Sequence, residues 1–137
     1  KKMSKSELSD LSRINLTDDK DQIINKIKKA KTDSMPMPTN VKELDERLEA
    51  KNLIGIFASL TNSNLDDSVE KFAGKNFSEF KENLSHVIVD KIEPISIEIK
   101  KLLNDQTYLD KILQEGIEKA DLIASKKIRK IKEIVGF

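Results

Sequence analysis

The chain has 137 residues, enough for one domain with an appended segment, and it can bury a core without disulfide or metal support. It contains no cysteine and a single histidine, His86, which excludes disulfides, thiolate metal sites and histidine-based zinc sites. Charged residues make up 36% of the chain, yet the net charge is +1, which argues against a uniformly basic nucleic-acid-binding coat but allows local basic patches.

No apolar run approaches the roughly 18 residues that a membrane-spanning helix needs, and no apolar signal-peptide segment follows the N-terminal lysines. The absence of cysteine fits a reducing compartment. The sequence therefore predicts a cytoplasmic protein without a membrane partner. Because the chain starts Lys1-Lys2-Met3 rather than with methionine, we expect it to begin inside a longer protein.

Two lysines and two serines stand within five residues at the start of the chain, in the order Lys2, Met3, Ser4, Lys5, Ser6. Lysine binds phosphate as a mobile point charge, and serine hydroxyls add hydrogen-bond donors. A loop of this composition can stabilise the negative charge that grows on pyrophosphate as it leaves ATP. The same composition is also common in charged tails, so the residues alone leave both interpretations open.

The next segment predicts a short helix that begins at Thr17, where a hydroxyl cap precedes Asp18 and Asp19. Its apolar face is marked by Ile23, Ile24, Ile27 and Ala30, and its last turns carry Lys26, Lys28, Lys29 and Lys31. These lysines can complement the helix dipole or approach nucleic acid. Pro36 and Pro38 then break the pattern, so residues 32–40 are predicted to be the linker between an N-terminal arm and a helical domain. Arm and linker together make up residues 1–40, and the helical domain is 41–137.

The pattern over residues 41–137 predicts four or five helices and no strand. Gly74 is a natural helix stop, a long apolar stripe beginning near Ser78 runs through Pro94 with a kink or a break, and a last helix begins near Asp105. Gly116 predicts a close helix crossing. The inner face of the last helix is expected at Leu109, Ile112, Leu113, Ile117, Ala120, Ala124, Ile128, Ile131 and Val135.

Basic residues gather toward the end of the chain. Between residues 119 and 133, six lysines and arginines face two acids, a balance of 6 − 2 = +4. This stretch can attract RNA phosphates, or it can be the solvated face of an amphipathic helix. The candidate RNA-binding residues are Lys126, Lys127, Arg129 and Lys130, with Lys75 and Lys81 as weaker candidates.

The sequence KMSKS matches the second signature of class I aminoacyl-tRNA synthetases. Five later stretches, namely SDLSRINLTDDKDQIINKIKKAKTDS, NLIGIFASLT, FAGKNFSEFKENL, KIEPI and YLDKILQEGIEKADLIASKKI, resemble the C-terminal portion of bacterial-type tryptophanyl-tRNA synthetases. The resemblance covers essentially the whole chain. It implies an all-α helical bundle for tRNA recognition, preceded by a KMSKS loop arm, with the Rossmann catalytic domain and the HIGH signature absent from this chain.

The resemblance also implies what each part does. Lys2 and Lys5 would be the catalytic cations facing the ATP phosphates, and Met3, Ser4 and Ser6 would complete the ATP-binding loop. ATP with Mg²⁺ on its phosphates and tryptophan would be substrates, and tRNA(Trp) would accept the tryptophanyl group. No protein-bound metal is implied. A homodimer through the missing catalytic domain is expected, and this chain alone should be inactive.

A different class of protein also fits the sequence, namely a stand-alone helical module that binds RNA or protein and starts at Met3 with a disordered basic tail. The upstream coding sequence distinguishes the two hypotheses. A nucleotide-binding region with a HIGH-like signature in frame supports the synthetase, whereas a stop codon and ribosome-binding site just before Met3 support the module.

Overall fold

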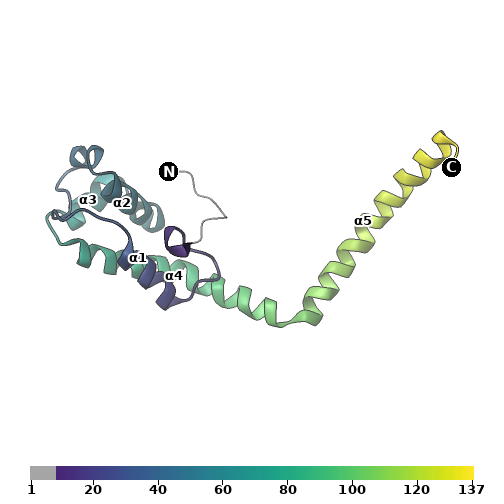
Figure 1. Ribbon diagram of the computed structural model, residues 1–137, viewed down its shortest axis with the longest axis horizontal. Helices are drawn as coiled ribbons and strands as arrows, with labels where there is room; N and C mark the ends of the chain where they lie inside the picture. The colour runs from purple at the N-terminus through teal and green to yellow at the C-terminus, as the bar shows by residue number, and fades with distance from the viewer. Residues whose placement is uncertain (1–8) are drawn as a thin grey trace. The chain divides into compact units, whose positions relative to one another are not determined.

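The computed structural model describes residues 9–137, which form helices joined by turns and contain no strand, as the all-α prediction requires. The chain divides into two units, one ending at Ile97 and one at Glu98–Phe137, and each is described by itself. No helix in residues 9–137 has the length and apolar character to cross a bilayer. The elements are η1 (Asp10–Ser12), α1 (Lys20–Lys29), η2 (Val41–Asp45), α2 (Leu48–Thr61), α3 (Leu65–Phe72), α4 (Phe77–Asn104) and α5 (Gln106–Val135) (Figure 1).

Side-chain caps set most of the helix starts. Asp19, not Thr17, caps α1, because its carboxylate accepts from the Gln22 N–H while the Gln22 side chain accepts from the Asp19 N–H, each over 2.9 Å. Asp105 caps α5 as predicted. After α3, Gly74 adopts a φ of +70°, which explains why a glycine stands at this stop.

The proline-containing segment packs into the first unit. Met37 is buried, and its N–H and C=O pair with the Lys75 C=O and the Gly74 N–H over 2.8 and 3.1 Å. Arg47 holds the same segment, since its guanidinium binds the Asp33 carboxylate through two nitrogens at 2.6 and 2.9 Å. The predicted domain boundary at residue 40 stays a prediction.

The core of the first unit is centred on three phenylalanines from three helices. Phe72 makes edge-to-face contacts with Phe57 and Phe80, with ring centroids 5.0 and 4.9 Å apart. α1 contributes Ile23 and Ile27 to the same apolar cluster. α1 lies beside the first half of α4 (Figure 1), where the Lys81 ammonium donates to the Ala30 carbonyl over 2.6 Å.

α4 is one continuous helix that contains Pro94, so the alternative of two abutting helices is wrong. α5 forms as predicted, but the face expected to be inner is exposed: Leu113, Ile117 and Ile131 are 57–63% accessible. Within the second unit, a side-chain carbon at Gly116 would meet nothing within 4 Å, and the close helix crossing at this position stays a prediction. Apolar periodicity identifies a face but does not say what covers it.

Candidate functional site

The predicted ATP-binding residues Lys2, Met3, Ser4, Lys5 and Ser6 lie outside the described residues, so their roles stay predictions. The described chain begins at Ser9, three positions after the motif. The segment that directly follows the motif contains η1 and leads into α1.

Asp10 lies at the start of η1, where the Ser9 hydroxyl accepts from the Leu11 N–H over 3.4 Å. Three donors converge on the Asp10 carboxylate. They are the Lys26 ammonium at 2.5 Å, the Asn15 side-chain amide at 3.0 and 3.1 Å, and the Arg13 guanidinium at 2.7 Å. The Asp10 carboxylate therefore connects the segment after the motif to Lys26 of α1, which stands 16 residues further along the chain.

Lys26 also binds Asp18, over 2.6 Å, and both of these side chains are almost completely buried. Asp18 accepts in addition from the Asn15 backbone N–H over 2.8 Å. Separating a buried ion pair of this kind is strongly unfavourable, because it leaves an uncompensated charge in the interior. Asp10, Lys26 and Asp18 are here named the Lys26 clamp.

The clamp shifts two pKa values. The hydrogen bond from Lys26, reinforced by Asn15, lowers the pKa of Asp10 from 3.8 to about 2. Burial of Lys26 disfavours its charged form, but the hydrogen bonds to Asp10 and Asp18 outweigh that effect and raise its pKa above 10.5. Asp10 and Lys26 are therefore both charged throughout the neutral range.

These shifts predict how stability depends on pH. Because the pKa of Asp10 is lower in the folded than in the unfolded chain, its stabilising contribution is present above about pH 4 and is lost as the pH falls toward about 2. Asp10→Asn should therefore flatten the acid limb of the stability curve, measured by denaturant unfolding between pH 2 and pH 7. An acid limb unchanged by this substitution would contradict the assignment.

The structure corrects one of the lysine predictions. Lys26 is enclosed by carboxylates and is not available to contact nucleic acid, whereas Lys28 and Lys29 are exposed. Lys31 pairs with Glu49 over 3.1 Å at the surface. The sequence signal for Lys26 is its position beside Ile23 and Ile27, since a lysine at the edge of an apolar face needs an acidic partner when it is buried.

Lys75 and Lys81 are also engaged. Lys75 pairs with Glu79 over 2.7 Å. The Lys81 ammonium donates to backbone carbonyls at the end of α1, and burial lowers its pKa. A cation at this position satisfies carbonyl groups that the helix end leaves without partners.

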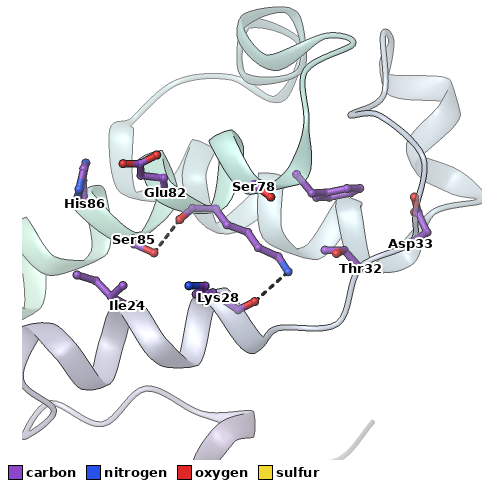
Figure 2. Close-up of a pocket in the computed structure, with 10 residues that line it drawn as sticks. Ile24, Lys28, Thr32, Asp33, Ser78, Glu82, Ser85 and His86 are labelled. Atoms are coloured by element: carbon purple, nitrogen blue, oxygen red, sulfur yellow. Dashed lines mark hydrogen bonds between the residues drawn. The ribbon is translucent and has the colours of Figure 1, made fainter.

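An open hollow of about 710 Å³ lies between α1 and α4 (Figure 2). The Lys81 ammonium reaches the Ala30 carbonyl at the end of α1, and Figure 2 shows Glu82 and His86 on α4 beside the hollow. His86 is exposed. The hollow is lined by positively and negatively charged side chains and by apolar carbon. Its lining residues are Ile24, Lys28, Thr32, Asp33, Phe77, Ser78, Lys81, Glu82, Ser85 and His86.

The four candidate RNA-binding residues of α5 are all exposed. Lys126, Arg129 and Lys130 line one shallow depression of that helix, together with Asp121 and Glu133. At 3.6 residues per turn, this surface points away from the apolar stripe. Among residues 9–137 no group of three or more metal-ligating side chains comes together.

Comparison with known proteins defines the class. The family model described as tRNA synthetases class I (W and Y) matches residues 1–93, which is more than half of the chain. The chain therefore belongs to the class I tRNA synthetases of the tryptophan and tyrosine type. This family relationship also includes residues 2–6, where the KMSKS motif stands.

Its relatives are named for tryptophan. The Tryptophan--tRNA ligase of Brucella melitensis is 45% identical over 137 residues, covering 100% of this chain and 39% of the relative. The enzymes of the same name from Agrobacterium fabrum and Rickettsia felis are 47% and 45% identical, again over 100% of this chain, and are covered to 39% and 41%. The chain thus spans about two fifths of the length of these relatives.

Proposed function

We propose that the chain is the C-terminal part of a tryptophan–tRNA ligase, which activates tryptophan with ATP and transfers it to tRNA(Trp) in translation. The observation that carries this proposal is the match of the whole chain, at 45–47% identity, to relatives named Tryptophan--tRNA ligase. The family match of residues 1–93 alone allows either tryptophan or tyrosine as the amino acid.

In the proposed reaction, a carboxylate oxygen of tryptophan attacks the α-phosphorus of ATP. The Mg²⁺ ion is bound to the ATP phosphates and enters as part of the substrate. The bond between the α-phosphorus and the bridging oxygen breaks, so tryptophanyl-adenylate forms and pyrophosphate leaves with the electron pair. Lys2 and Lys5 neutralise the charge growing on that leaving group, while Met3, Ser4 and Ser6 complete the loop. Preorganised donors aimed at developing charge act on the transition state more than on the ground state.

Residues 41–137 form the proposed tRNA-recognition domain, which residues 1–40 connect to the catalytic part. The proposed enzyme works in the cytoplasm as a homodimer through its catalytic domain, and the present chain alone is inactive. The exposed basic residues on α5 support an electrostatic contact with tRNA.

The contact proposed for α5 has a measurable salt signature. Replacing Lys126, Arg129 and Lys130 by glutamine should weaken tRNA binding and reduce the slope of log affinity against log salt by roughly 0.7–0.9 per lost phosphate contact. The matched control replaces Lys20, Lys42 and Lys51 by glutamine, since these lysines are exposed on other elements. An equal slope for the two triple variants would reject the α5 contact.

The amino acid is tested by ATP–pyrophosphate exchange on the full-length protein, with tryptophan and tyrosine in parallel. Exchange supported by tryptophan, and lower by orders of magnitude with tyrosine, is expected. Preferential exchange with tyrosine would assign the chain to the other branch of the family, and no exchange with either amino acid would reject the proposal.

A further inference from the structure

The Lys26 clamp holds the chain directly after the proposed ATP-binding loop. Asp10 is four residues beyond Ser6, the last residue of the motif, and its carboxylate is bound by α1. We propose that the Lys26 clamp positions the KMSKS segment relative to the first unit. Asp10, Asp18 and Lys26 are then positioning residues for the reaction of ATP with tryptophan. This inference rests on the proposed function of the motif.

Few residues separate the clamp from the motif. Four residues span at most roughly 14 Å when fully extended, so only a short stretch of chain separates the motif from Asp10. With Asp10 released, the next contact of this segment with the core of the first unit is at Ile14, eight residues after Ser6. Doubling the length of chain between the motif and its nearest fixed point should lower the probability that the motif cations meet the phosphates.

The clamp also connects a partly exposed residue to two side chains that are buried in the first unit. Lys26 and Asp18 are 8% and 6% exposed at their side chains, and neighbouring Ile23 and Ile27 lie in the apolar core of the first unit. Asp10 is different, because 46% of its side chain is exposed and it meets this interior pair from the outside. The buried pair fixes the site, and Asp10 attaches the motif segment to it.

This asymmetry separates positioning from folding. Asp10→Asn removes one exposed charge while the buried pair of Lys26 and Asp18 remains intact, so the helical unit should fold normally. Because a misplacement of about 1 Å can reduce a rate by roughly 10²-fold, we expect kcat/KM for ATP in pyrophosphate exchange to fall by roughly 10–100-fold. The affinity for tryptophan should be unchanged, and Asp10→Glu should recover part of the loss.

The matched control is Asp45→Asn. Asp45 makes an exposed ion pair with Lys51 over 2.8 Å in a different part of the first unit, so the same substitution removes a comparable contact away from the motif. The control should keep wild-type exchange kinetics. All variants are made in the full-length protein and compared for exchange kinetics, tryptophan binding and thermal unfolding.

A double-variant cycle with Lys5→Ala decides the outcome. If Asp10 acts through the motif, Asp10→Asn should cost clearly less in the Lys5→Ala background than in the wild type, because one of the two cations that it positions is gone. Fully additive losses, or an Asp10→Asn variant as active as Asp45→Asn, would overturn the positioning role alone. Normal exchange in Lys5→Ala itself would overturn the proposed role of the motif and this inference with it, whereas no exchange in the wild type would overturn the proposed ligase function.

Discussion

Replacing Phe80 with alanine is expected to lower the free energy of unfolding by about 3–5 kcal/mol. Phe80 is completely buried, and its ring packs edge-to-face on Phe72 with centroids 4.9 Å apart and lies near Phe57 at 6.2 Å. Truncation removes the buried apolar surface, leaves a cavity among rings from three helices, and abolishes an aromatic contact that contributes roughly a further 0.5–1.5 kcal/mol.

Denaturant unfolding followed by far-ultraviolet circular dichroism measures this loss. Phe137→Ala is the matched control, because the same truncation at a residue that is 94% exposed should change stability by no more than about 0.5 kcal/mol. A Phe80 variant as stable as this control would show that the three rings do not form the core described here.

The second large effect is expected from Lys5→Ala in the full-length protein. Removing one preorganised donor from a site of developing charge typically slows the chemical step by about 10²–10³-fold, so adenylate formation should slow by that factor. Tryptophan affinity should change little, because Lys5 is proposed to act on the departing diphosphate rather than on the amino acid.

Single-turnover adenylate formation measures the effect, with tryptophan binding determined separately. Lys42→Ala is the control, because Lys42 is exposed on η2 and lies outside the motif. Equal rates in the two variants would mean that Lys5 does not contribute to catalysis.

Local sequence signals predicted the helices better than their starting residues. Asp105 and Gly74 mark helix boundaries as predicted, because each is a single clear cap or stop in its segment. Thr17, Asp18 and Asp19 are three consecutive residues of the capping type, so the cap of α1 was not determined by local preference. Gln22 selects Asp19 through the capping box, while Asp18 turns to the buried Lys26.

Longer-range contacts explain what the sequence pattern missed. The sequence pattern predicts that Lys26 complements the helix dipole or approaches nucleic acid, because its partners Asp10 and Asp18 stand 16 and 8 residues away and form no spacing motif. The amphipathic pattern of α5 correctly predicted a helix with an apolar stripe, yet that stripe is exposed. The ATP-binding role of residues 2–6 is predicted from composition and resemblance alone, and these residues lie outside the described chain.

The proposal that the motif cations stabilise the pyrophosphate leaving from ATP can be tested by pyrophosphate exchange in the full-length protein with Lys2 and Lys5 both replaced by methionine. These substitutions remove the charges but keep side chains of similar length. Tryptophan should still bind, while exchange should fall below that of either single variant. Exchange at the wild-type rate would rule out a role of these cations in the departure of pyrophosphate.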